Sequence, residues 1–149
     1  MPLKRHSALI NLSRDHYAGL LLASVLKKDS PDFKNMPTSP DEKAIHVKLK
    51  YDTELKAHFE AEEKILFPFV KGKAIELDKI INELIEEHRL LEAGIVGLAS
   101  STDLVTSLDN VGKLLESHIR KEERQLFEGI QEILTEGELG VLERKLQGH

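Results

Sequence analysis

Four of the seven histidines fall on stripes that repeat every three or four residues together with aliphatic side chains. In chain order these are His16, His58, His88 and His118. In the pairs His58–Glu62 and His118–Glu122 a carboxylate lies four residues after the His. Because residues i and i+4 lie on one face of a helix, each pair points inward together. Imidazole and carboxylate donors gathered in this way indicate a metal site, with iron favoured and manganese or zinc as alternatives.

The sequence around these pairs is repeated. HFEAEEKILF at 58–67 aligns with HIRKEERQLF at 118–127, and Asp15-His16 upstream aligns with Glu87-His88. Each half of the chain is therefore a helix with one His followed by a helix with HxxxE. A two-fold relation between the halves would bring four imidazoles and two carboxylates to one level of the core. Buried ionised groups are costly unless opposite charge compensates them, and two divalent cations would supply that charge.

Helices must position these side chains, and the apolar periodicity predicts four long ones. The first spans about 7–28, and the second begins near a cap at Asp41 and ends near Gly72. Aliphatic residues from Ile81 to Leu98 mark the third helix, those from Val111 to Leu126 mark the fourth, and Leu139 to Leu146 form a short fifth. The segment 29–40 holds three of the five prolines and is predicted to be a loop. We expect an all-α fold, an up-down-up-down antiparallel four-helix bundle with a short C-terminal fifth helix.

Length and composition restrict the classes of function. A chain of 149 residues predicts one domain over 1–149. The absence of Cys excludes disulfides, iron–sulfur ligation and thiol catalysis, and it fits a reducing compartment, so we expect a cytoplasmic protein. A net charge of −5 without a basic block favours neither nucleic acid nor a membrane surface as partner. No apolar run is long enough for a membrane span.

These residues together resemble the hemerythrin-like (HHE cation-binding) family, over roughly 7–130 of the chain. The resemblance rests on Asp15-His16, on His58 to Glu62 before Leu66-Phe67-Pro68, on Glu87-His88, and on His118 to Glu122 before Leu126-Phe127. It implies a non-haem di-iron centre, with two iron ions joined by an oxo or hydroxo bridge, inside a four-helix bundle. It also implies the ligands: His16 and His58 for one iron, His88 and His118 for the other, and Glu62 and Glu122 as bridges.

Two positions depart from the oxygen-carrying members of this family. Those proteins have a second His four residues after the first on the third helix, where this chain has Glu92. Glu92 shares a helix face with His88 and is predicted to be a seventh ligand, the alternative being a boundary residue that reaches solvent. A third carboxylate would favour the ferric state and oxidase-type chemistry over reversible oxygen carriage. The carriers also have their last carboxylate five residues after the final His, which makes Glu123 a further candidate. On a regular helix, however, Glu63 and Glu123 face outward or sideways.

We expect a metal-binding protein rather than an enzyme, one that binds dioxygen, nitric oxide or iron itself for storage, sensing or stress protection. One alternative is a di-iron oxidase or peroxidase on the same scaffold. Another is a helical interaction module that holds zinc or no metal. The sequence identifies no protein partner.

Overall fold

The computed structural model describes residues 4–148, and within that range it contains helices and no strand. The helical elements join into five continuous segments. These are α1 (Ser7–Leu26); α2 (Pro40–Lys50), η1 (Tyr51–Leu55), α3 (Lys56–Ala61), η2 (Glu62–Leu66) and α4 (Phe67–Val70); α5 (Ile75–Gly97) and η3 (Leu98–Ser100); α6 (Leu104–Lys121), η4 (Glu122–Phe127) and α7 (Glu128–Ile133); and α8 (Glu136–Gln147). The predictions of an all-helical chain and of a short C-terminal helix are confirmed. No described helix combines the length and the apolar character needed to cross a membrane.

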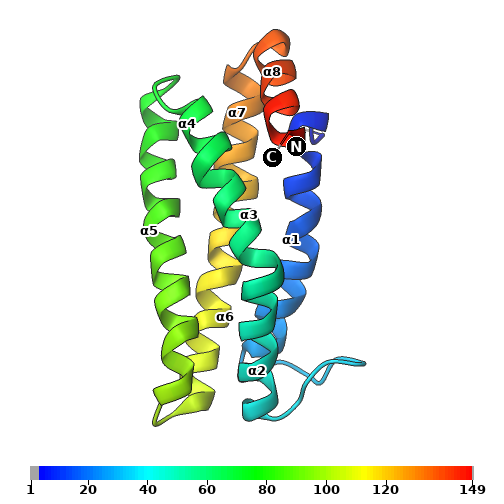
Figure 1. Cartoon of the computed structure of the whole chain (residues 1–149), viewed down its shortest axis with the longest axis vertical. Coiled ribbons are helices and arrows are strands. Elements are labelled where there is room, and N and C mark those ends of the chain that lie inside the picture. Colours follow the sequence, from blue (N-terminus) through cyan, green and yellow to red (C-terminus); the bar gives the residue numbers. More distant parts are fainter. Residues whose placement is uncertain (1–3, 149) are drawn as a thin grey trace.

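The long segments lie side by side along the long axis of the molecule, and the chain reverses direction from each one to the next (Figure 1). The short helix α8 sits at one end, beside the start of α1. There the side chain of Ser7 donates a hydrogen bond to Glu143, and His6 lies 2.8 Å from Glu136. The C-terminal helix therefore covers the end of the molecule where α1 begins.

Side-chain caps set where several helices begin. The Nδ1 atom of His6 accepts a hydrogen bond from the backbone N–H of Ala8 and caps α1. Ser39, rather than the predicted Asp41, caps the second segment by accepting from the N–H of Glu42. The prediction was wrong because Pro40 fits the first helical turn, where no backbone N–H is needed, so the helix starts earlier.

Two π-helical elements begin at the carboxylates of the HxxxE pairs. Glu62 is the first residue of η2 and Glu122 is the first residue of η4. In η2 the backbone N–H of Phe67 donates to the carbonyl of Glu62, five residues earlier rather than four. The wider turns follow the HxxxE pairs, whose own four-residue step is regular α-helix, because the N–H of Glu62 donates to the carbonyl of His58 and that of Glu122 to the carbonyl of His118.

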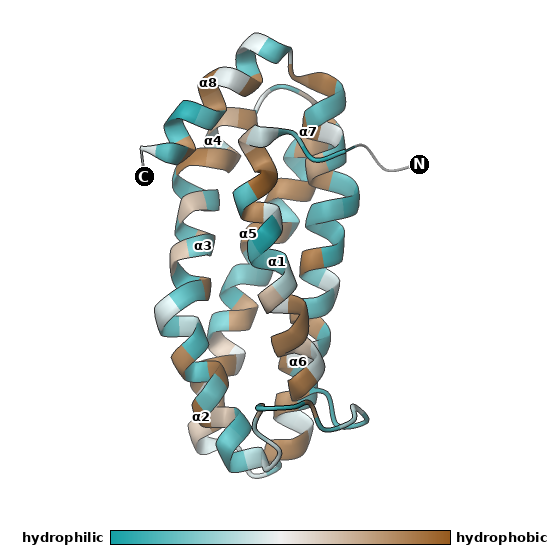
Figure 2. Ribbon diagram, turned by 90° about the vertical axis from the view of Figure 1, so that its right-hand side faces the viewer, coloured by the Kyte–Doolittle hydropathy of each residue, from teal (hydrophilic) through white to brown (hydrophobic). Residues whose placement is uncertain are grey.

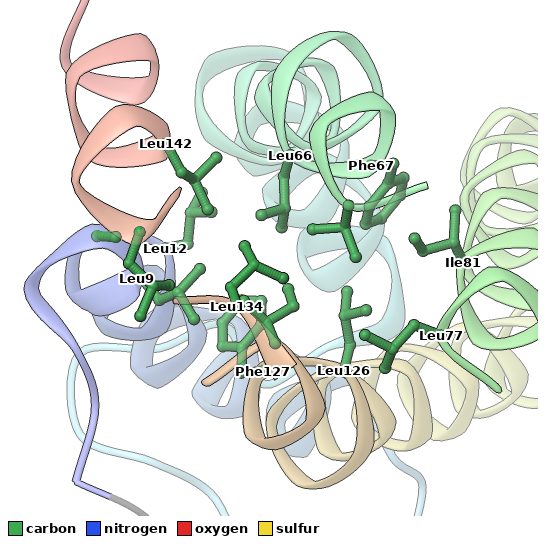
Figure 3. Close-up of a cluster of buried hydrophobic side chains, with 14 of the residues drawn as sticks. Leu9, Leu12, Leu66, Phe67, Leu77, Ile81, Leu126, Phe127, Leu134 and Leu142 are labelled. Atoms are coloured by element: carbon green, nitrogen blue, oxygen red, sulfur yellow. The ribbon is translucent and has the colours of Figure 1, made fainter. Parts of the chain in front are cut away.

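Two clusters of buried apolar side chains hold the helices together. One joins Leu9, Leu66, Leu126 and their neighbours under α8, and Figure 3 shows these side chains meeting from several helices. The other includes Leu22 and Leu91 toward the opposite end. Figure 2 shows hydrophobic and hydrophilic residues alternating along each helix, as expected for helices with one buried face. The four inward histidines lie between the two clusters along their helices.

Candidate metal centre

Six of the predicted ligands come together in the interior of the helices. They are His16 on α1, His58 on α3, Glu62 at the start of η2, His88 on α5, His118 on α6 and Glu122 at the start of η4. All six are buried, and both glutamates have a relative exposure of 0%. Because water cannot reach these two carboxylates, only neighbouring protein groups or a bound cation can stabilise their charge.

The donor atoms form two adjacent groups of four. One ligand atom from each of His16, His58, Glu62 and Glu122 lies within 4.8 Å of the others. The same holds for one atom from each of Glu62, His88, His118 and Glu122. The two carboxylates belong to both groups, whereas each imidazole pair belongs to one. The arrangement can therefore hold two cations side by side, with the carboxylates between them.

The distances in the two halves agree, as the sequence repeat predicts. The Nε2 atom of His16 lies 3.1 Å from Glu122 Oε1, and that of His88 lies 3.1 Å from Glu62 Oε1. Within each HxxxE pair, Nε2 lies 3.4 Å from the carboxylate for His58 and 3.5 Å for His118. Every Nε2 atom therefore faces the pair of glutamates.

Several of these inward atoms have no hydrogen-bond partner. They are both carboxylate oxygens of Glu62, Oε2 of Glu122, and Nε2 of His88 and of His118. The 3.1 Å contact between His88 and Glu62 is close, but it lacks the alignment of a hydrogen bond. Orphaned polar atoms in a protein interior are costly and rare. Several unpaired nitrogen and oxygen atoms that face one space fit a bound cation. Because these atoms belong to imidazoles and carboxylates, the site suits a transition metal.

A second set of carboxylates contacts the histidines on the side that faces away from the two glutamates. Each inward imidazole points its Nδ1 atom at one of them: His16 at Glu123 (2.6 Å), His58 at Asp15 (3.0 Å), His88 at Glu63 (2.6 Å) and His118 at Glu87 (2.8 Å). An Nδ1–H that donates to a carboxylate fixes the ring and its tautomer, and it leaves the Nε2 lone pair free for a metal. These four carboxylates therefore orient the ligands.

Two of these outer carboxylates, Glu63 and Glu123, were expected to face outward or sideways. Both stay partly exposed, with side-chain exposures of 21% and 25%. Each is nevertheless long enough to reach the Nδ1 atom of an imidazole on a neighbouring helix. Glu123 thus supports His16 and lies outside both groups of candidate ligands. The signal was present in the sequence, because both halves repeat Glu-Glu after the His.

Three of the outer carboxylates also contact cations. Arg89 pairs with Glu63, Lys121 pairs with Glu87, and Arg5 pairs with Glu123. The exception is Asp15, whose side chain is 61% exposed and which contacts no Lys or Arg within the described part of the chain. The support of His58 is therefore the most solvent-accessible of the four.

The electrostatics of the cluster favour positive charge. Burial alone would lower the pKa of His16, but its contacts with Glu122 and Glu123 outweigh this effect and raise the pKa to about 9. The pKa of His58 is raised well above its usual value against the same burial effect, chiefly by the charge of Glu62. Burial would raise the pKa of Glu122, but contacts with Glu62 and with the histidines lower it well below its usual value. The carboxylate of Glu122 therefore stays ionised and attracts cations.

The structure does not bring the predicted seventh ligand, Glu92, into the centre. Glu92 is exposed, belongs to neither group of donors, and has Tyr51 as its neighbour. Helices α3 and α5 run in opposite directions (Figure 1). A four-residue step from His88 therefore leads along α5 to the level of Tyr51, away from Glu62. The two groups of donors therefore contain six of the seven predicted ligands.

A buried set of imidazole and carboxylate donors within an all-helical chain defines a helical cation-binding protein. Comparison with family models agrees, because the model of the hemerythrin HHE cation binding domain matches residues 8–130. The chain therefore belongs to the hemerythrin HHE cation-binding domain family, and the resemblance noted in the sequence is confirmed. Comparisons with curated proteins and with solved structures gave no match.

Proposed function

We propose that the chain holds two iron ions between its helices and binds dioxygen or nitric oxide, or serves iron storage or stress protection, in the cytoplasm. The scaffold is an up-down-up-down four-helix bundle closed at one end by α8. The observation that supports this proposal best is the pair of four-donor groups that share Glu62 and Glu122. Because both groups of donors include the same two carboxylates, the arrangement fits two metal ions better than a single ion.

Each residue of the centre has a definite role in this proposal. His16 and His58 would hold one ion, His88 and His118 would hold the other, and Glu62 and Glu122, which belong to both groups of donors, would serve both. When bound, iron supplies the capacity to change oxidation state and to bind a diatomic molecule. The outer carboxylates keep a proton on each Nδ1 atom, so that Nε2 remains a donor toward the ion.

Aromatic rings limit the access of water to the imidazoles. Phe59 stacks on His88 with ring centroids 3.9 Å apart, and Phe67 stacks on the same imidazole at 5.9 Å. Phe127 stacks on His16 at 5.5 Å. A low-polarity surround of this kind controls solvent access and with it the chemistry of a bound metal.

The composition of the two donor groups bears on the two alternative functions, an oxidase or peroxidase and a helical interaction module. An oxidase or peroxidase was favoured by Glu92 as a third carboxylate ligand, and Glu92 lies outside the centre. A helical module without metal would leave the orphaned atoms of Glu62 and Glu122 uncompensated in the interior. Zinc and manganese accept the same donors, so the identity of the metal is decided by experiment.

A spectroscopic experiment tests the proposal. Protein purified without chelator is analysed for metals, loaded anaerobically with ferrous iron, and exposed to air or nitric oxide while its absorption spectrum is recorded. We expect about two irons per chain and, in air, near-ultraviolet bands of a bridged ferric pair, with a reversible visible band if the protein binds dioxygen for carriage or sensing. The variant Glu122→Gln should lose these bands, whereas Glu60→Gln, on the more exposed side of the same segment, should keep them. Native zinc, or no spectral change on iron loading, would contradict the proposal.

A further inference from the structure

A cavity of about 410 Å³ lies beside the centre. It opens between α1 and the segment formed by α2, η1 and α3. The imidazoles of His16, His58 and His118 lie in its wall, whereas His88 does not belong to the described lining. The two halves of the centre, which agree in their internal distances, therefore differ in what surrounds them.

The wall of this cavity is mostly apolar. Its buried part is formed by Leu12, Gly19, Leu22, Phe59, Leu115 and Ile119. Ala18 on α1 and Ala57 on α3 are exposed and stand at the mouth. Met36, half-buried in the proline-rich segment that precedes α2, also lines it. A concave, largely preformed pocket with aliphatic walls is the usual form of a site for an apolar small molecule.

Most polar groups of the cavity already have partners. Lys50 at the mouth forms an ion pair with Glu54 at 3.0 Å. Asp15 contacts Nδ1 of His58, and both nitrogens of His16 face glutamates. The pKa of His46 at the mouth is lowered by partial burial and by Lys50, so this imidazole is neutral at pH 7. A charged ligand would therefore lose its hydration and find few unpaired groups in the wall.

The volume sets the size of the occupant. A dry apolar cavity of about 150 Å³ is enough to hold a benzene molecule. A cavity of about 410 Å³ has room for more, up to a bicyclic or diaryl molecule, and far exceeds the need of a diatomic gas. We infer that this cavity is a binding site for a neutral, apolar organic molecule, which is held between α1 and α3 against His16 and His58. The inference goes beyond the proposed function and holds whichever metal occupies the centre.

The test uses two fluorescent probes that differ by one charged group. N-phenyl-1-naphthylamine is neutral, and 8-anilinonaphthalene-1-sulfonate has the same aromatic frame with a sulfonate. The chain contains no Trp, so naphthylamine emission can be read without a tryptophan background. We expect one neutral probe to bind per chain with a blue-shifted emission, and the anionic probe to bind at least about tenfold more weakly. Toluene should displace the neutral probe.

Matched variants locate the binding. The double substitution Ala18→Leu and Ala57→Leu adds side-chain volume at the mouth, on exposed helical positions that tolerate Leu, and should weaken binding about tenfold. Ala93→Leu makes the same change on an exposed face of α5 outside the cavity and should leave binding unchanged.

A second readout does not depend on fluorescence. The chain has two methionines, so carbon-13 labelling of the methionine methyl groups gives a simple spectrum in which Met36 reports on the cavity. We expect its signal to shift saturably with the neutral probe. Equal binding by the double variant, equal affinity for both probes, or an unmoved Met36 signal would overturn the inference. Each of these results would leave the metal content unaffected, so the inference can fail separately from the proposed function.

Discussion

Removal of the metal should lower the thermal stability of this protein by a large amount. The centre buries two carboxylates at 0% exposure and leaves five donor atoms without hydrogen-bond partners. An ion that binds only the folded chain stabilises it by about 2.7 kcal/mol when its free concentration is a hundred times the dissociation constant. Two such ions give about 5 kcal/mol. For a chain of this length each kcal/mol corresponds to about 2–4 °C, so we expect the midpoint of unfolding to fall by about 10–20 °C.

The assay is differential scanning calorimetry of the protein saturated with ferrous iron under anaerobic conditions, or with zinc, compared with the same protein in excess chelator. The double variant Glu62→Gln and Glu122→Gln should unfold at one temperature in both conditions, because it lacks the carboxylates that both groups of donors share. Glu60→Gln should retain the full difference. The reasoning is refuted if the chelator leaves the midpoint of the unaltered protein unchanged, or if the double variant keeps the difference.

Three further predictions concern pH, the position of Glu92, and the packing of α1 on α6. In the metal-free protein, the raised pKa of His16 contributes stability that is fully present below pH 6.5 and is lost as the pH rises through about 9. Unfolding midpoints of chelated protein should therefore fall across this window, while metal affinity measured by chelator competition rises, since the ion must displace the proton. A flat profile for either quantity would count against the raised pKa. Glu92→Gln should leave metal content and the near-ultraviolet bands unchanged, because this side chain is exposed, and loss of one ion would restore it as a ligand. Gly112→Ala should destabilise the fold by about 1–3 kcal/mol in urea, because the added Cβ would lie 2.7 Å from the carbonyl oxygen of Ala23, whereas Gly97→Ala, with free space around it, should not.

The helical periodicity of the sequence predicted most of the fold and most of the inward-facing candidate ligands. The inward stripes placed His16 and His88 on their helices correctly, and the repeat related the two halves before their positions in space were known. These features are encoded locally, in the three- and four-residue spacing of apolar side chains, and local spacing is what a sequence displays most directly.

The sequence could not show the features that depend on tertiary arrangement. Glu63 and Glu123 lie partly exposed on their own helices, and their contacts with His88 and His16 depend on how the neighbouring helices pack. Glu92 satisfies the i+4 rule, but the opposite directions of α3 and α5 carry it away from the centre. The apolar cavity results from how α1 packs against α3, which no single helix encodes.

The central claim is that Glu62 and Glu122 are shared by two metal ions. Anomalous X-ray diffraction from crystals of the metal-loaded protein, recorded at the absorption edge of the metal that elemental analysis finds, tests it most directly. The account predicts two anomalous peaks per chain, about 3.5–4 Å apart, one beside His16 and His58 and the other beside His88 and His118. A single peak would contradict this claim. Two peaks that both lie away from Glu62 and Glu122 would contradict it as well.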